Sequence, residues 1–193
     1  MLVPGLIEWP ARIPQPRSTK VRATTSDLLP TLCALVGQPL PNRPIDGTDL
    51  IPLIDRKMKE RPVPLFFWIY KGHSARDINH EPYIDPKLQE GTTPLVKLSA
   101  GKATRDFKNF IHPSISEDDY LGPRTIIDGD MKLVVHDQKR GESRFELFDL
   151  QSDPGEKNNI IDQQPATAKE LQARLLQWQK SVLNSLTGAD YRK

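Results

Sequence analysis

Residues 124–136 read "RTIIDGDMKLVVH", and this stretch decides the fold of the second half of the chain. Apolar residues flank Asp128-Gly129, and glycine tolerates the positive φ that tight hairpin turns require. The stretch therefore predicts an antiparallel β-hairpin. Downstream, "RFELFDL" at 144–150 predicts the next strand, and upstream "VPLFFWIY" at 63–70 is rich in the aromatic and branched residues that favour strands.

A long amphipathic helix is predicted over residues 165–186. Pro165 suits the first helical position, where the missing N–H would lack a helical partner in any case. Large apolar residues then recur every three or four positions and share one face of the helix. This stripe comprises Leu171, Leu175, Trp178, Val182 and Leu186. About four antiparallel strands crossed by one helix make a small α+β domain.

The first sixty residues show a different pattern. "LVPGLIEW" at 2–9 is apolar and predicts a buried strand, and "TTSDLLPTLCALVG" at 24–37 predicts a helix that ends at Gly37. Thr25 or Ser26 is expected to cap this helix, with Asp27 in its positive first turn. Its apolar face comprises Leu28, Leu32, Leu35 and Val36.

A charged stretch near residue 60 marks the expected domain boundary. We predict that residues 1–61 form the end of a larger α/β domain. Residues 62–193 are predicted to form the small domain, with a long irregular segment at about 71–123. A chain that opens inside a strand suggests the tail of a longer protein.

The composition narrows the range of partners. The net charge of the 193 residues is +2, which gives no reason to expect a nucleic acid or a membrane as partner. No run of about 18 apolar residues is present to span a bilayer. Prolines number 18, which predicts ordered but irregular connections. The single cysteine, Cys33, excludes an internal disulfide.

Several residue types capable of chemistry favour a structural interpretation. Asp118-Asp119 is interpreted as a solvated loop, because hard cations need several oxygens that a fold brings together. Cys33 lies in an apolar helix and is interpreted as a packing residue. None of the histidines has the i, i+4 spacing of a helical zinc site, and His136 is interpreted as the end of a strand.

The irregular segment holds the remaining candidates. Its basic residues are interleaved with acids and indicate a solvated surface; they are Lys71, Arg76, Lys87, Lys97, Lys102, Arg105 and Lys108. His80 and His112 are interpreted as exposed loop residues. His73 directly follows a strand, where rigid scaffolds often present functional groups, so it is the predicted substrate contact, with an exposed loop histidine as the alternative.

Four motifs, taken together, resemble the C-terminal part of a sulfatase of the alkaline-phosphatase-like superfamily. "SDLLPTLCALVG" is similar to the family helix D-L-x-P-T-x-x-x-x-x-G, and "IDGTDLIPLI" to D-G-x-x-L-x-P-L. "RTIIDGDMKLV" is similar to the hairpin R-x-x-x-D-G-x-x-K-L. "ELFDLQSDPGEKNNI" is similar to L-Y-D-L-x-x-D-P-x-E-x-x-N-L.

The two ends of the chain extend this resemblance. "VPGLIEWPARI" at 3–13 looks like a strand that follows the last active-site segment of these enzymes. "WQKSVLNSLTGADY" at 178–191 resembles the tail of a bacterial arylsulfatase-like group. The matches follow the order of the family over nearly the whole chain. They imply an alkaline-phosphatase-like α/β fold that ends in a small α+β domain.

The resemblance implies hydrolysis of sulfate esters with Ca²⁺ and a formylglycine made from the Cys or Ser of C/S-x-P-x-R. That motif does not occur here, because Cys33 is followed by Ala-Leu-Val-Gly. The calcium-binding pairs have no counterpart either, and the resemblance gives Asp118-Asp119 no metal role. We therefore expect no catalytic residue and no metal ligand in this chain. Ca²⁺ and formylglycine are expected in an N-terminal part.

The resemblance further implies a sulfated small molecule or glycan as the substrate of the complete enzyme. Relatives of this kind are usually periplasmic or secreted. Two alternatives remain open: a phosphate- or phosphonate-ester hydrolase of the same superfamily, and a non-catalytic module that binds a sulfated glycan or a protein. The mixed charge argues against the module, because glycan binding favours a basic cluster.

Overall fold

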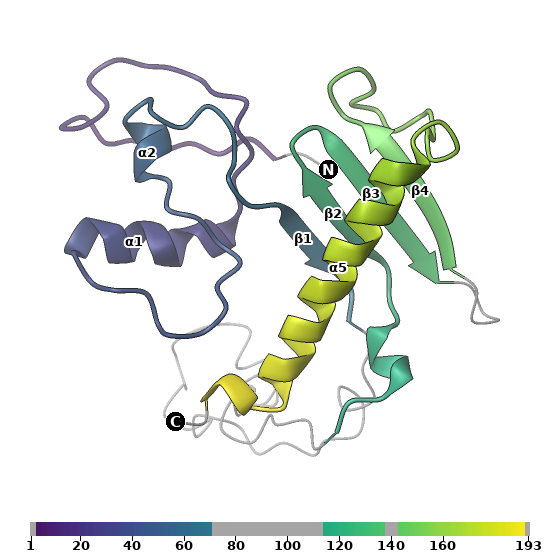
Figure 1. Cartoon of the computed structure of the whole chain (residues 1–193). Helices are drawn as coiled ribbons and strands as arrows, with labels where there is room; N and C mark the ends of the chain where they lie inside the picture. Colours follow the sequence, from purple (N-terminus) through teal and green to yellow (C-terminus); the bar gives the residue numbers. More distant parts are fainter. Residues whose placement is uncertain (1–2, 71–113, 138–142, 192–193) are drawn as a thin grey trace, which may run out of the picture.

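The computed structural model describes residues 3–70, 114–137 and 143–191 (Figure 1). Its longer elements are α1 (Leu28–Val36), α2 (Ile51–Ile54), β1 (Leu65–Trp68), β2 (Arg124–Asp128), β3 (Met131–Asp137), β4 (Ser143–Asp149) and α5 (Pro165–Leu186). Short 3-10 turns are η1 (Thr25–Asp27), η3 (Glu117–Tyr120) and η4 (Ala189–Tyr191).

The strands form one antiparallel sheet in the order β1-β2-β3-β4. The predicted hairpin is confirmed: Asp128 pairs with Met131, so Gly129 and Asp130 form its loop. Gly129 has a φ of +55°, in the left-handed region that glycine adopts without strain. The small four-stranded domain predicted from the sequence is therefore present.

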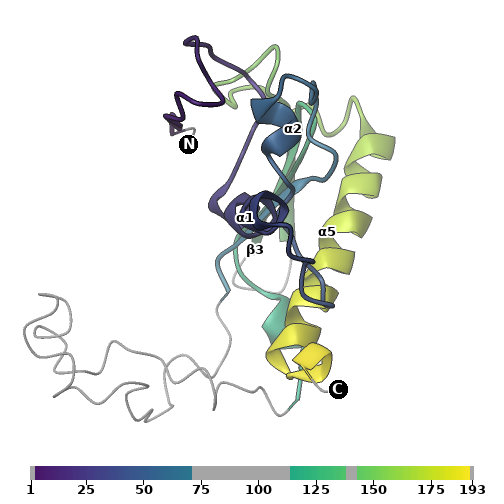
Figure 2. The same cartoon turned by 90° about the vertical axis from the view of Figure 1, so that its left-hand side faces the viewer.

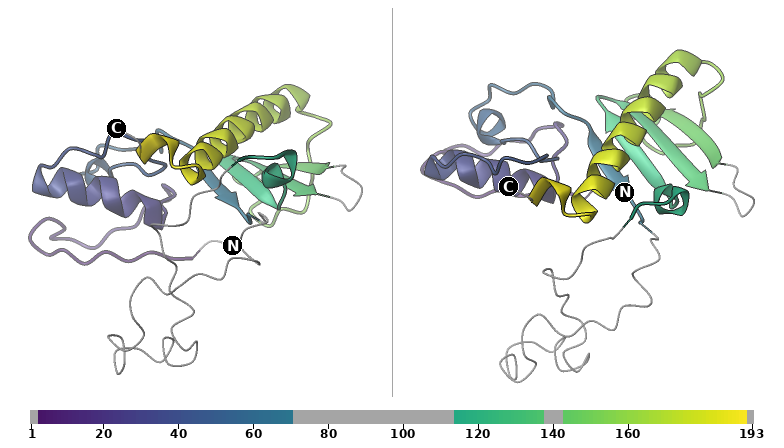
Figure 3. Two further views of the ribbon diagram at one scale, coloured as in Figure 1. Left: turned by 90° about the horizontal axis from the view of Figure 1, so that it is seen from below. Right: turned by 60° about the horizontal axis from the view of Figure 1, so that its bottom comes forward.

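Helix α5 lies across one face of this sheet (Figures 2 and 3). Its bounds match the predicted helix, and Pro165 stands in the first turn. The register places Ile126, Leu133 and Leu147 side by side beneath the helix, all fully buried. Buried helix residues complete this core: Ala168, Leu171 and Leu175.

The predicted apolar stripe of α5 is correct in its first half and wrong in its second. Val182 and Leu186 are only half-buried, whereas Gln179 and Leu183 are buried. A polar residue is tolerated in a buried position where its hydrogen bonds are made. The side-chain amide of Gln179 donates to the Tyr120 carbonyl at 3.0 Å. A hydrophobic pattern gives no sign of such a partner.

The sequence "DPGE" at 153–156 predicts a helix-capping turn, with Asp153 as the cap, Pro154 at the first helical position and Glu156 reaching back, and the structure differs from this prediction. No helix follows Asp153; its carboxylate instead accepts the backbone N–H groups of Lys157 and Asn158, at 2.7 and 2.8 Å. Glu156 does not reach back, because its carboxylate accepts the Lys132 ammonium at 2.6 Å. The polar residues of this motif thus tie the turn to itself and to the sheet.

The predicted strand at residues 2–9 is wrong for the residues that the structure describes. Residues 3–9 form no regular element, and Leu6 is 95% exposed. A strand requires a neighbouring strand for its backbone N–H and C=O groups. None of the four strands of the described sheet pairs with this segment, so it stays unpaired.

Helices α1 and α2 lie beyond the β1 edge of the sheet (Figures 1 and 3). The predicted helix and its stop are confirmed, because Gly37 closes α1 with a φ of +67°. Its cap is not the predicted one, since Thr24 precedes η1 and Asp27 opens α1. Five large apolar residues of α1 are between 40% and 68% exposed: Leu28, Leu29, Leu32, Leu35 and Val36.

Candidate functional site

A buried carboxylate joins the two helical segments to the sheet side of the molecule. Asp27 is fully buried and accepts two hydrogen bonds from the Arg61 guanidinium, both at 2.7 Å. The backbone N–H groups of Thr24 and Thr48 also donate to it, each at 2.8 Å. We call these residues, with Thr31, the Asp27 cluster.

The electrostatics of the Asp27 cluster favour the ionised carboxylate. Burial alone would raise the pKa of Asp27, but the hydrogen bonds from Arg61, Thr48 and Thr24 outweigh burial and hold this pKa below its ordinary value. Thr31 continues the cluster: its hydroxyl donates to the Asp27 carbonyl at 2.6 Å and accepts the Leu50 N–H at 3.0 Å.

Close backbone packing at Gly47 completes this junction. A Cβ atom at that position would lie 2.0 Å from the carbonyl oxygen of Ser26. Only glycine lets the two loops pass at this distance. Asp27, Thr31 and Gly47, which belong to the sequence motifs at 26–37 and 45–54, therefore have structural roles. The sequence analysis did not predict the buried pairing of Asp27 with Arg61.

A second cluster stands where β1 ends. The Tyr70 hydroxyl donates to Asp119 Oδ1 at 2.8 Å, and Asp119 Oδ2 accepts the Ser116 N–H at 2.8 Å. Asp119 is 4% exposed, so the predicted solvated loop is wrong for this residue, while Asp118 is exposed. Burial and the Asp119 carboxylate together raise the pKa of Tyr70 above its ordinary value.

Further hydrogen bonds fix the same place in the fold. Trp68 Nε1 donates to the Leu121 carbonyl at 3.0 Å, and the Ile69 N–H donates to the Pro123 carbonyl at 2.8 Å. These contacts hold the end of β1 against residues 116–123. A serine three positions before a carboxylate was the sequence signal for this turn.

The predicted substrate contact, His73, lies outside the described residues, as do His80, His112 and the basic residues named with them. His136 and Cys33 are among the candidates that the structure describes. His136 Nε2 lies 3.0 Å from Glu146 Oε2 on the face of the sheet opposite α5. Cys33 is a half-buried free thiol within α1.

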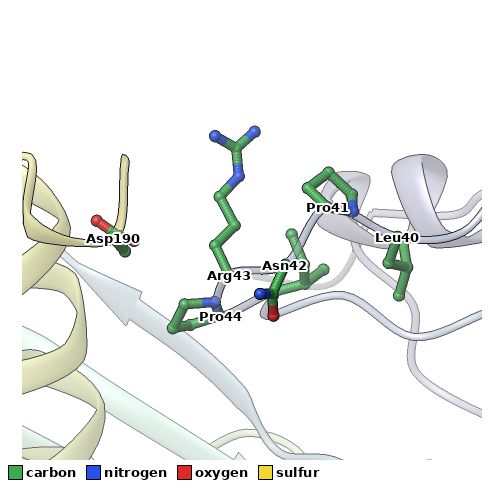
Figure 4. Close-up of a pocket in the computed structure, with 7 residues that line it drawn as sticks. Leu40, Pro41, Asn42, Arg43, Pro44 and Asp190 are labelled. Carbon is green, nitrogen blue, oxygen red and sulfur yellow. The ribbon is translucent and has the colours of Figure 1, made fainter. Parts of the chain in front are cut away.

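One open recess lies between the loop at 40–45 and the C-terminal turn η4. Figure 4 shows Asp190 facing this loop, from which the Arg43 side chain extends. The rest of the lining is mostly proline and aliphatic. This recess brings together no pair of groups suited to acid–base or nucleophilic chemistry.

A second recess is strongly basic. It lies where residues 12–17 meet the end of α2, and we call it the basic recess. Arg12 donates to both oxygens of Asp55, each at 2.8 Å, and its guanidinium carbon lies 5.2 Å from the centroid of the Trp9 ring. The hydrogen bonds from Arg12 hold the pKa of Asp55 below its ordinary range. The remaining cations are Arg17, Arg56 and Lys57.

Neither the clusters nor the recesses form a metal centre. Within residues 3–70, 114–137 and 143–191, no three His, Cys, Asp or Glu side chains gather as metal ligands. The described residues therefore do not gather the several oxygen ligands that a calcium ion requires. No helix in the described part of the chain is long and apolar enough to cross a membrane.

Comparison with known proteins gives clear sequence relatives. The chain is 32% identical to human arylsulfatase A over 184 residues, which cover 94% of this chain and 31% of that protein. It is 32% identical to arylsulfatase A of Bos taurus over 167 residues, 86% of this chain and 27% of that protein. The chain thus spans less than a third of these relatives. No protein-family model matches it.

Solved structures give a slighter likeness. A phosphonate monoester hydrolase of Agrobacterium radiobacter aligns with a TM-score of 0.42 and 18% identity, over 85% of this chain and 24% of that one. A protein solved in complex with its substrate D-glucosamine-2-N,6-O-disulfate aligns with a TM-score of 0.44 and 19% identity, over 80% of this chain and 23% of that one. The resemblance to the sulfatases therefore rests on the two arylsulfatase A sequences.

Proposed function

Because this chain belongs to the sulfatase family and resembles its C-terminal portion, we propose that it forms the C-terminal part of a sulfuric-ester hydrolase. The observation that carries the proposal is the 32% identity to human arylsulfatase A over 94% of the chain. The complete enzyme would hydrolyse a sulfate ester of a small molecule or a glycan. Formylglycine and Ca²⁺ would belong to the part of the enzyme that precedes this chain.

Apart from His73, the role of this chain in that enzyme would be structural support. The polar residues of its motifs are engaged in the fold rather than free for catalysis: Asp27 with Arg61, and Asn159 with the Leu147 N–H at 2.9 Å. The exposed apolar residues of α1 offer a surface on which the rest of the enzyme would pack. Burial of such a surface contributes about 25 cal/mol for each Å² removed from water.

Packing on α1 can be tested in the longer polypeptide that contains this chain. Leu32→Glu places a charge on the exposed face of α1 and should abolish sulfate-ester hydrolysis, because the two parts would no longer assemble. Leu176→Glu is the matched control, since Leu176 is also exposed but lies on α5. Equal activity of both variants would argue against packing on α1.

The class of ester is decided by a parallel assay. The longer polypeptide should hydrolyse an aryl sulfate faster than the matching aryl phosphate, and the 193-residue chain alone should hydrolyse neither. Faster hydrolysis of the phosphate or a phosphonate would favour the alternative within the superfamily. Absence of ester hydrolysis by the longer polypeptide would leave the non-catalytic binding module.

His73 remains our proposed substrate contact. It follows Tyr70 by three positions in the sequence, and Tyr70 is fixed by Asp119. In the longer polypeptide, His73→Ala should lower kcat/KM on the natural substrate at least tenfold, about 1.4 kcal/mol of transition-state stabilisation. A small aryl sulfate should be affected much less, and unchanged kcat/KM on both substrates would exclude this role.

A further inference from the structure

The basic recess carries more positive charge than the fold around it requires. Four cations line it, Arg12, Arg17, Arg56 and Lys57, and Asp55 is the one acid among its lining residues, so the lining carries a surplus of three positive charges. The whole chain has a net charge of only +2. The recess, of about 460 Å³, therefore concentrates a charge that the remainder of the sequence does not share.

The guanidinium groups of Arg12 and Arg17 are both held in place by hydrogen bonds, but only that of Arg12 is paired with a carboxylate. Arg12 spends Nε and Nη2 on Asp55, which leaves the Nη1 donors of its planar fork for another partner. Arg17 donates through Nη2 to the Ile54 carbonyl, a neutral acceptor. A side chain that is already fixed loses less rotamer entropy when it binds a ligand.

The other two cations face the recess from the chain that follows α2. No ion pair of Arg56 is found within the described residues, and its backbone φ of +64° turns the chain at this point. The Lys57 ammonium lies 4.0 Å from Asp55, and its side chain is 76% exposed. Arg17 caps the end of α2 through the Ile54 carbonyl. This capping does not account for the other three cations of the recess.

We propose that the basic recess binds a tetrahedral oxyanion, a sulfate or phosphate group. Arginine forks match the oxygen geometry of such groups and form charge-assisted hydrogen bonds to them. A recess of about 460 Å³ has the size of a small-molecule site and is too small for the length of a nucleic-acid backbone. The site lies within residues 12–57 and does not include His73, the proposed substrate contact of the hydrolase.

Binding of a heparin-derived hexasaccharide to the 193-residue chain tests the proposal, followed by calorimetry and by tryptophan fluorescence, to which Trp9 beside Arg12 contributes. The sulfated hexasaccharide should bind, its desulfated form should not, and inorganic sulfate should compete. The double substitution Arg56→Asn with Lys57→Gln should weaken binding at least tenfold. Asparagine tolerates the left-handed φ at position 56, so the fold should be retained.

The matched control removes the same charge elsewhere. Lys169→Gln with Lys180→Gln takes two exposed lysines from α5, and it should leave the affinity within about twofold of the parent chain. An equal loss in both double variants would show attraction by net charge and overturn the site. Equal binding of the desulfated sugar would overturn it as well. Binding of inorganic phosphate or sulfate alone, lost in the recess variant, would keep the oxyanion site and exclude the sugar as its carrier.

Discussion

The two parts of this chain treat their apolar residues in opposite ways. In the sheet with α5, Ile126, Leu133 and Leu147 are fully buried beneath a helix of the same chain. In α1, the large apolar residues are left 40% to 68% exposed. The sheet with α5 therefore completes its own core. The N-terminal part with α1 lacks a partner for its apolar face among the described residues.

The contacts that attach the N-terminal part to the sheet are mainly polar. The Asp27 cluster joins η1 and the loop before α2 to Arg61 just before β1, through hydrogen bonds of 2.7 to 2.8 Å. Such bonds fix geometry, yet each contributes only about 1 kcal/mol net when both partners are neutral and more when one is charged. A part held in this way can be well placed and still have low stability.

The largest expected effect is at Trp178, whose ring stacks on Phe66 of β1 at a centroid distance of 4.9 Å and an interplanar angle of 6°. This contact confirms that the residue lies against the sheet. Trp178→Ala should lower the free energy of unfolding by about 3–5 kcal/mol, because it leaves a cavity in the core. Thermal unfolding measures the loss. Leu176→Ala, exposed on the same helix, is the control and should change little.

Asp27→Asn should come next, with a loss of about 3 kcal/mol, because Arg61 would be left buried without its counter-charge. The loss should be concentrated in residues 3–61, which tests whether this cluster ties the two parts together. Hydrogen exchange of the variant measures where the loss occurs. If the amides of α5 lost as much protection from exchange as those of α1, the cluster would stabilise the whole molecule evenly.

The same carboxylate predicts a dependence on pH. Its pKa is held below the ordinary value, so its stabilising contribution is complete above the pKa of an unfolded aspartate, about 3.9, and is lost as the pH falls toward the lower folded value. Unfolding of the parent chain between pH 7 and pH 3 should show this loss, and Asp27→Asn should reduce it. An identical pH profile in both would contradict the assignment.

Gly47→Ala should have a smaller effect, about 1–3 kcal/mol, since the added methyl group would lie 2.0 Å from the Ser26 carbonyl and force the two loops apart. Gly155→Ala is the matched control: its nearest contact would be the flexible Lys157 side chain at 3.4 Å. Denaturant unfolding of the two variants gives the comparison. Equal stability of both would show that the loops near Gly47 separate at little cost.

The parts that local patterns specify were predicted from the sequence. The bounds of α5, the hairpin at Gly129 and the following strand follow from periodicity and turn chemistry, which need only neighbouring residues. The resemblance of the motifs to the sulfatases was confirmed by the sequence relatives. Of the named site, His73 lies outside the described residues and stays a prediction.

The errors occur where a residue depends on a partner far along the chain. The buried role of Asp27 rests on Thr48 and Arg61, and that of Asp119 rests on Tyr70, 49 positions away. Gln179 is buried because the Tyr120 carbonyl meets it. The expected strand at 2–9 failed for a related reason, because backbone pairing is decided by a neighbouring strand and not by composition.

Hydrogen exchange of the 193-residue chain tests the central contrast most directly. Amides of α5 should exchange at least a hundredfold more slowly than those of α1, because α5 opens only with the sheet core while α1 opens by breaking a few polar contacts. The measurement needs peptides from Leu28–Val36 and from Pro165–Leu186. Slow exchange in α5 with fast exchange in α1 is the predicted result, and equal protection of the two helices would contradict the account.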